Sequence, residues 1–136
     1  HQGLRKLVAD LNHLYLSHST WSKVDHQSDK FRWVDCNDSA SQTVSFLKFG
    51  QHSQDTLLVA CNFSNQVVHR DWGCPHRGKW EVIFDSDAPH YGGAGAAGGT
   101  EFLTFPEARN AQPEGLAFAV GRWSVRILKF DRSFEC

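Results

Sequence analysis

Apolar residues near the start of the chain recur at spacings of three and four, which is the period of one face of an α-helix. Charged and polar side chains occupy the positions between them, so the pattern predicts one amphipathic helix over residues 3–17. Such a helix needs an apolar partner along one side. The residues of its apolar stripe are Leu4, Leu7, Val8, Leu11, Leu14 and Tyr15.

From residue 31 onward, apolar and polar residues alternate in short runs, which is the pattern of β-strands with one buried face. Turn-forming residues separate the runs, so the predicted fold class is all-β: an antiparallel β-sandwich preceded by one N-terminal α-helix. The run at residues 56–64 is the most continuously apolar and is predicted to be a central strand. The predicted strands are residues 31–36, 43–49, 56–64, 67–72, 79–85, 100–105, 115–120 and 122–130.

The predicted strand at residues 79–85 ends in the most specific turn of the chain. Short polar side chains that hydrogen-bond to nearby backbone are followed by a proline, which cannot donate a backbone hydrogen bond, and then by two glycines. This combination predicts a structural turn that closes one edge of the sandwich. The turn residues are Asp85, Ser86, Asp87, Tyr91, Gly92 and Gly93.

Charge and composition narrow the classes of partner. The formal net charge is −1 and the Lys and Arg residues are scattered, so neither nucleic acid nor an anionic membrane surface is an expected partner. No apolar run approaches the ~18 residues of a membrane span, and no secretory signal pattern is visible. The four cysteines stand at long, irregular spacings, which predicts reduced thiols and a cytoplasmic location.

Residues 93–98 match the expression G-x-G-x-x-G of dinucleotide-binding sites letter for letter. That motif works where a strand turns directly into a helix whose N-terminus faces the phosphates. Here a proline-containing segment separates the strand from the glycines, and another strand pattern follows them. These glycines are therefore predicted to form a surface loop, and no cofactor is predicted.

Two other groups of residues contain side chains that are found in metal sites or catalytic sites. Cys74 and His76 could begin a zinc site, but no second pair stands at ligand spacing, so no metal is predicted. Asp85 and Asp87, with His90 nearby, could divide acid and base roles. Because backbone capping in the turn already accounts for both aspartates, no catalytic residue is predicted in this chain.

The five tryptophans are the candidates for carbohydrate contact, because a tryptophan ring offers the largest flat apolar face together with a polar edge. Alternation assigns Trp80 and Trp123 to the core. Trp33 lies near the start of the β domain, Trp21 in a polar linker and Trp72 near a loop. These last three residues are the predicted carbohydrate contacts.

Several short motifs stand in the same order as motifs in the C-terminal β domain of bacterial-type 1,4-α-glucan (glycogen) branching enzymes. Trp80-Glu81, Asp85-Ser86-Asp87 and Tyr91-Gly92-Gly93 resemble the W-E, (N/D)-S-D and Y-G-G run of that domain. The resemblance spans roughly residues 3–99. The further motifs are Asp10 to Tyr15 (D-L-N-x-L-Y), Phe31 to Trp33 (G-F-x-W), Val44 to Leu47 (S-V-x-S-F) and Asn62 to Ser64 (N-F-(T/S)).

The resemblance implies an α-amylase-type C-terminal domain attached to a catalytic (β/α)8 barrel. In that family the enzyme cleaves α-1,4 linkages of a glucan and forms α-1,6 branches, and both catalytic carboxyl groups lie on the barrel. Residues 1–22 are then expected to be the last barrel helix plus a linker, and residues 23–136 the C-terminal β-sandwich domain. The absence of methionine, even at position 1, also predicts a piece of a longer protein.

On this interpretation, the partners are the upstream barrel and a glycogen-like or starch-like α-glucan. The piece itself is expected to be inert, to stabilise the barrel and to contact glucan. Part of the helix stripe would normally be buried by the barrel, so the isolated piece is expected to self-associate weakly. The alternative is that the whole stripe packs on the β domain alone.

The end of the chain departs from the family pattern, because Gly121-Arg122-Trp123-Ser124 stands where prolines are usual. This departure leaves the subfamily and the route between the last two strands open. Two other interpretations also stay open: a free-standing carbohydrate-binding module, and the β domain of another amylase-family hydrolase or transferase.

Overall fold

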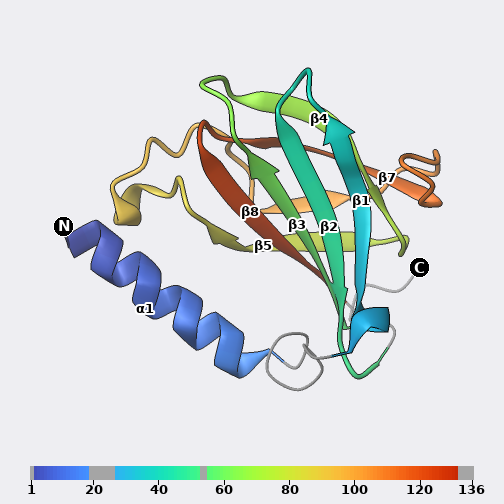
Figure 1. The fold of residues 1–136 in the computed structure, drawn as a ribbon, viewed down its shortest axis with the longest axis horizontal. Helices are drawn as coiled ribbons and strands as arrows, with labels where there is room; N and C mark the ends of the chain where they lie inside the picture. Colours follow the sequence, from blue (N-terminus) through green and yellow to red (C-terminus); the bar gives the residue numbers. More distant parts are fainter. Residues whose placement is uncertain (1, 19–26, 53–54, 132–136) are drawn as a thin grey trace.

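The fold is a β-sandwich of two unequal sheets, with one helix lying against the larger sheet (Figure 1). The computed structural model describes residues 2–18, 27–52 and 55–131. The larger sheet has six strands in the order β1-β2-β3-β8-β5-β6, and the smaller is a two-stranded ribbon of β4 and β7. The elements are α1 (Gln2–Ser17), the 3₁₀ turn η1 (Ser28–Lys30), β1 (Phe31–Asp38), β2 (Thr43–Phe49), β3 (Thr56–Asn62), β4 (Val68–Cys74), β5 (Lys79–Asp85), the 3₁₀ turn η2 (Pro89–Tyr91), β6 (Glu101–Leu103), β7 (Glu114–Val120) and β8 (Ser124–Phe130).

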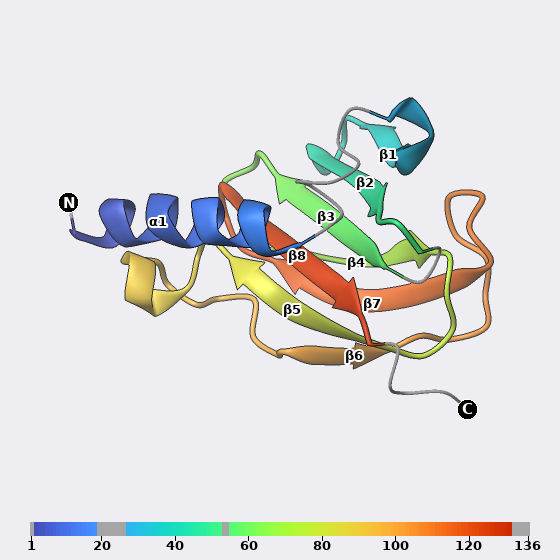
Figure 2. The same ribbon diagram turned by 90° about the horizontal axis from the view of Figure 1, so that it is seen from below.

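Helix α1 and the β4–β7 ribbon lie on opposite faces of the six-stranded sheet (Figure 2). We call the face toward the ribbon the inner face and the face toward α1 the outer face. Along β3, Leu58 belongs to the inner cluster, whereas Leu57 and Val59 belong to the outer one. A strand covered on both faces must be apolar at successive positions, which explains the continuous apolar run of β3.

The predicted fold class is confirmed, and α1 and each of the eight strands overlap the predicted ranges, with ends that differ by up to two residues. Strand β3 ends at Asn62 rather than at residue 64, because the Asn62 side chain forms hydrogen bonds with the backbone of the turn that follows. Its Oδ1 accepts the N–H of Ser64 at 2.9 Å, and its Nδ2 donates to the carbonyl groups of Gln66 at 2.7 Å and Gly121 at 2.9 Å. Among the described residues, no helix has the length and hydrophobicity needed to cross a bilayer.

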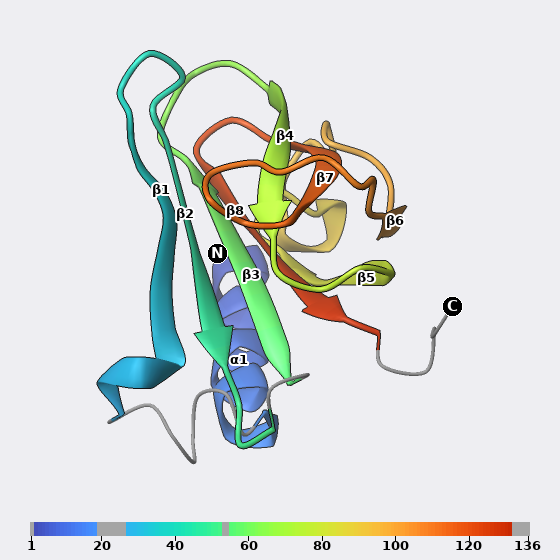
Figure 3. The ribbon, with the colours of Figure 1, turned by 90° about the vertical axis from the view of Figure 1, so that its right-hand side faces the viewer.

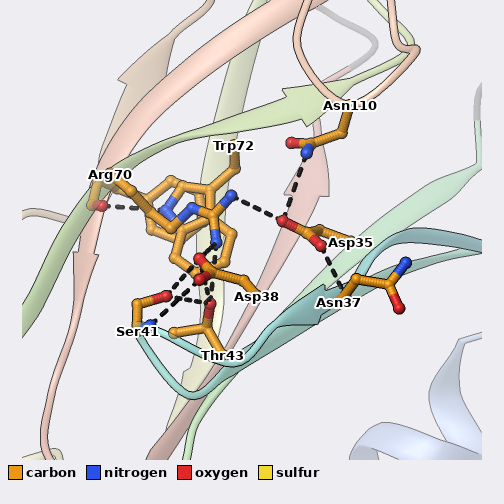
Figure 4. A network of polar contacts seen from close by, with 9 residues as sticks. Asp35, Asn37, Asp38, Ser41, Thr43, Arg70, Trp72 and Asn110 are labelled. Carbon is orange, nitrogen blue, oxygen red and sulfur yellow. Dashed lines mark hydrogen bonds and ion pairs between the residues drawn. The ribbon is translucent and has the colours of Figure 1, made fainter.

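Arg70 ties the β1 edge of the large sheet to the ribbon (Figures 3 and 4). Its guanidinium donates to Asp35 at 3.0 Å and to Asp38 at 2.5 Å, both on β1, and to the hydroxyl of Thr43 at 2.8 Å. The same guanidinium lies 4.7 Å from the centre of the Trp72 ring on β4. This network connects the two sheets at the β1 edge.

Candidate functional site at the helix-bearing face

Helix α1 packs on the outer face through one side only, against strands β3, β8 and β5. Leu7, Leu11 and Leu14 supply this contact from the helix. None of the helix residues is fully buried, so each leucine gains only part of the roughly 1.5–3 kcal/mol that complete burial provides. The sheet residues beneath the helix are Leu57, Val59, Ile83, Phe84, Val125 and Ile127.

The rest of the apolar stripe faces away from the sheet. Leu4 is 60% exposed, Val8 48% and Tyr15 45%. The stripe is therefore wider than the surface that the sheet covers, and the alternative that all of it packs on the β domain is wrong. Exposed apolar residues on one side of a helix make that side a candidate contact surface.

A polar contact fixes the helix to the turn that follows β5. The hydroxyl of Tyr91 donates to Oδ2 of Asp10 at 2.6 Å, and Lys6 lies 3.5 Å from the same oxygen. The hydrogen bond from Tyr91 and the charge of Lys6 lower the pKa of Asp10, whereas burial and Asp10 raise the pKa of Tyr91 to about 12. At Gly3, a Cβ atom would collide with the carbonyl oxygen of Tyr91. Two motifs that are 81 residues apart in sequence are thus in direct contact.

Replacing Tyr91 by Phe is expected to raise the pKa of Asp10 toward its ordinary value, because the lost hydrogen bond is the largest cause of its depression. A depressed carboxyl pKa stabilises the fold above the unfolded-state pKa, and this contribution disappears as pH falls through the folded-state pKa. The stability difference between wild type and Tyr91→Phe should therefore be present at neutral pH and shrink on acidification. A ¹³C NMR titration of the Asp10 carboxyl group measures the pKa directly.

The chain's second tyrosine provides a matched control for this substitution. Tyr15 lies on the exposed side of α1, so Tyr15→Phe should leave the pKa of Asp10 unchanged. An Asp10 pKa that does not respond to Tyr91→Phe would show that the contact does not hold the helix in solution.

The aspartates of the predicted turn bind backbone N–H groups. Oδ1 of Asp85 accepts the N–H of Asp87 at 2.9 Å. The two carboxylate oxygens of Asp87 accept the N–H groups of Ala94 at 3.0 Å and Ala96 at 3.1 Å. Both carboxylates therefore organise the turn and the loop that follows it. A paired arrangement for acid–base catalysis would need them free to face a substrate.

The remaining turn residues close the strand ends and require glycine at two positions. Ser86 exchanges two hydrogen bonds with the backbone of Val125, at 2.8 and 3.0 Å. Gly92 has φ 90°, in the left-handed region that favours glycine, and a Cβ at Gly93 would collide with the backbone of Asp87. Residues 93–98 form no helix, so the G-x-G-x-x-G match lies in a loop.

Arg126 is a buried polar link that sequence patterns did not identify. It is 2% exposed and lies on the inner face, where its guanidinium donates to the carbonyl groups of Ala119 on β7 at 2.9 Å and Gly99 at 2.6 Å. Its Nε lies 3.1 Å from Oδ2 of Asp85, as an ion pair outside hydrogen-bond geometry. Burial lowers the pKa of Arg126, and Asp85 opposes that shift. The residue joins β8, β7 and the glycine loop.

Three aromatic residues form a cluster on the outer face beside the area that α1 covers. The ring centres of Phe31 and Trp33 are 5.0 Å apart, and those of Phe31 and Phe46 are 5.1 Å apart. Trp33 is 52% exposed, so one of its faces is open. Phe46 also packs against the apolar cluster under the helix, which makes this aromatic cluster continuous with the helix-bearing face.

The other tryptophans differ from their predictions or lie elsewhere. Trp72 has no exposed surface and donates from Nε1 to the carbonyl of Phe118 at 3.0 Å, so the predicted carbohydrate contact at Trp72 is wrong. Trp80 is fully buried, as predicted. Trp123 was assigned to the core but is 67% exposed, because it stands in the turn between β7 and β8 rather than in a strand. Trp21 lies outside the described residues.

The described cysteines are free thiols, in agreement with the prediction from spacing. Cys36 is exposed, whereas Cys61 is half-buried and Cys74 is buried. Burial raises the pKa of Cys61, and it raises the pKa of Cys74 to about 12. A buried thiol with a raised pKa is unreactive, so Cys74 acts as a small apolar core residue.

Comparison with known proteins identifies the domain. The family model of the alpha amylase C-terminal all-beta domain matches residues 33–131. The 1,4-alpha-glucan branching enzyme GlgB of Thermosynechococcus vestitus is 35% identical over 135 residues, which are 97% of this chain and 17% of that protein. The enzyme of the same name from Synechocystis sp. is 34% identical over 99% of this chain and 18% of its own length. The one from Synechococcus elongatus is 41% identical over 69% of this chain and 12% of its own length.

The chain thus spans less than a fifth of the length of these relatives. Among solved structures, an alpha-amylase from H. orenii is 15% identical, covers 75% of this chain and 16% of its own, and superposes with a TM-score of 0.42, which is too distant to add to the assignment. The family match covers most of the chain and coincides with the eight strands. The chain belongs to the alpha-amylase C-terminal all-beta domain family.

Proposed function

We propose that this chain is the non-catalytic C-terminal β domain of a 1,4-α-glucan branching enzyme. In this proposal residues 1–22 are the last helix of a (β/α)8 catalytic barrel with its linker, residues 23–136 are the β domain, and the parent enzyme acts on glycogen-like or starch-like glucan in the cytoplasm. The names of the similar proteins support the activity, and the free thiols are compatible with a reducing compartment.

The observation that carries the proposal is the two-sided helix. One side of α1 is anchored to the β domain by three leucines and by the Asp10–Tyr91 hydrogen bond. The other side presents Leu4, Val8 and Tyr15 to solvent. A helix that is firmly attached on one side and apolar on the other is suited to lie between two domains. We assign the open side to the catalytic barrel, and we propose weak self-association when that partner is absent.

The chemistry of the parent enzyme belongs to the barrel in this proposal. A retaining double displacement needs a carboxylate nucleophile and a carboxyl acid/base about 5 Å apart. Asp85 and Asp87 are the pair that the sequence offers for this role, and both are engaged with backbone N–H groups and, for Asp85, with Arg126. The chain contributes stability and placement of the barrel.

A chimeric enzyme tests the proposal. The part of the T. vestitus branching enzyme that matches this chain is replaced by this chain, and branching of amylose is followed as loss of the iodine stain. The chimera is expected to be active. Leu4→Glu together with Val8→Glu should lower its activity about tenfold, which corresponds to about 1.4 kcal/mol of lost interdomain packing. The chain alone should leave the stain unchanged.

Leu103 provides the control, because its exposed fraction of 60% equals that of Leu4 but it lies on the edge strand β6. Leu103→Glu should leave the chimera active. Equal activity of the two variants would contradict the barrel contact and favour a free-standing module. A stain change by the chain alone that Asp85→Asn or Asp87→Asn abolishes would place catalysis in this domain.

A further inference from the structure

Two large aromatic residues are exposed side by side at one end of the six-stranded sheet. Phe63 follows β3 and is 53% exposed, and Trp123 precedes β8 and is 67% exposed. Asn62 pairs with Ser124 in the register of β3 and β8, so the next residue outward on each strand is Phe63 and Trp123 respectively. The N–H of Trp123 donates to the carbonyl of Ser64 at 3.1 Å, which holds the two turns together.

The backbone of Trp123 is in a conformation that a bulky residue rarely adopts. Its φ is +49°, in the left-handed region where glycine is the default. The turn around it is fixed by a bond from Ser124 Oγ to the carbonyl of Gly121 at 2.7 Å and by one from Arg122 Nε to the carbonyl of Asn65 at 3.2 Å. An exposed tryptophan does not contribute to packing in the core, and backbone strain of this kind is concentrated at functional sites.

A shallow, open cleft of about 390 Å³ lies beside Phe63, on the side away from Trp123. Gln42, whose φ is also positive at 57°, lines it and accepts the N–H of Phe63 at 2.9 Å through its carbonyl. Asp38 borders the cleft but is already engaged, because Oδ1 accepts the N–H of Ser41 at 3.1 Å and Oδ2 accepts hydrogen bonds from Arg70 and Thr43 (Figure 4). The exposed polar side chains of the cleft are Asn37, Ser39 and Gln42, whereas Thr43 is buried.

The side chains at this end of the sheet are suited to bind a neutral, polyhydroxylated ligand. Flat apolar rings offer a surface for the C–H face of a sugar, and amide and hydroxyl groups beside them bind the hydroxyl groups of the sugar. A chain of sugar units can extend across several such positions. Neighbouring strands are about 4.8 Å apart, so Gln42, Phe63 and Trp123 stand in a row across three strands.

We propose that the Phe63–Trp123 end of the sheet binds an α-glucan chain, with the two aromatic rings beneath successive sugar units and the cleft residues bound to their hydroxyl groups. The choice of α-linked glucan rests on the proposed function. The site lies beyond the apolar cluster under α1, because Phe63 follows Cys61, the last β3 residue of that cluster, by two positions, or roughly 7 Å. A glucan held here would be retained by the parent enzyme outside its catalytic barrel.

Calorimetric titration of the whole chain with maltoheptaose tests this site, with the indole N–H signals followed by NMR. Trp123→Gly and Phe63→Ala are each expected to weaken binding about tenfold. Tyr15→Ala is the control, because Tyr15 is also an exposed aromatic residue but lies on α1, and it should keep the wild-type affinity. Trp33→Ala tests the competing contact that the sequence predicts at Trp33. Cellohexaose, a β-linked glucan, should not bind.

Trp123→Gly separates binding from folding. Glycine adopts a positive φ without strain, so this variant is expected to melt at or above the temperature of the wild type while it loses affinity. Unchanged affinity in Trp123→Gly would overturn the proposal, as would a tenfold loss in Trp33→Ala, which would place the contact at Trp33. Equal binding of cellohexaose would overturn the α-glucan assignment. Absence of maltoheptaose binding would overturn this site and leave the chimera experiment to decide the proposed function.

Discussion

Replacing Arg126 by Met is expected to lower the free energy of unfolding by about 3 kcal/mol, at the lower end of the range for removing one partner of a buried ion pair. The variant loses the donors to the carbonyl groups of Ala119 and Gly99, and the carbonyl of Ala119 becomes a buried acceptor without that bond. It also leaves Asp85 without its cation. The lower end of the range applies because the Asp85 side chain is 15% exposed and Oδ1 keeps its bond to the backbone of Asp87.

The expected loss corresponds to a fall in melting temperature of about 10 °C for a chain of this size. Urea unfolding followed by far-ultraviolet circular dichroism measures the free energy. Arg122 gives a matched control, because it is an exposed arginine only four residues away, and Arg122→Met should change the free energy by less than about 0.5 kcal/mol. Equal effects of the two substitutions would show that the buried guanidinium does not connect the sheets.

The elements of the fold could be predicted from the sequence because their signals are local. A period of 3.6 positions identified α1, and a period of two identified the strands. The division into six strands and two could not be predicted in this way. Pairing of β3 with β8 joins residues more than 60 positions apart, and the pattern of either strand is satisfied by any apolar neighbour.

Two tryptophans show where alternation succeeds and where it ends. Trp123 was assigned to the core by extending the β8 pattern backward into residues that form a turn. In β4, His69 and Asp71 are exposed and Trp72 is buried, so alternation within the strand indicates the burial of Trp72, whereas its nearness to a loop wrongly indicates exposure. The period of a strand is informative only within the strand, and there it should outweigh distance from a loop.

The contacts that define the candidate site were beyond sequence analysis for a different reason. Asp10 and Tyr91 each belonged to a recognised motif, but nothing in either motif states that they touch. Arg70 and Arg126 are charged residues at positions that strand alternation assigns to the inner face, and this combination indicates a buried charge. A buried arginine requires partners. Their identities, such as Asp38 and Ala119, depend on the tertiary arrangement.

Replacing Trp72 by Ala is expected to cost about 4 kcal/mol of unfolding free energy, which is typical for truncation of a buried tryptophan. Trp72 has no exposed surface, stacks on Phe118 with ring centres 5.1 Å apart, and supports the guanidinium of Arg70 at 4.7 Å. Its Nε1 also satisfies the carbonyl of Phe118. Alanine would leave a cavity between the sheets, and the guanidinium of Arg70 would lose its contact with the Trp72 ring.

Trp33→Ala is the control that matches both the residue and the substitution. Trp33 is 52% exposed and makes only edge-to-face ring contacts with Phe31 and Phe46, so its truncation should cost less than about 1 kcal/mol. Urea unfolding of the two variants gives this comparison. Trp72→Phe keeps most of the packing and should bind maltoheptaose like the wild type. If Trp72→Phe lost affinity for maltoheptaose without losing stability, Trp72 would have to contact the sugar despite its burial. The expected results, a large loss of stability in Trp72→Ala and unchanged affinity in Trp72→Phe, would make Trp72 a core residue that holds the ribbon to the large sheet.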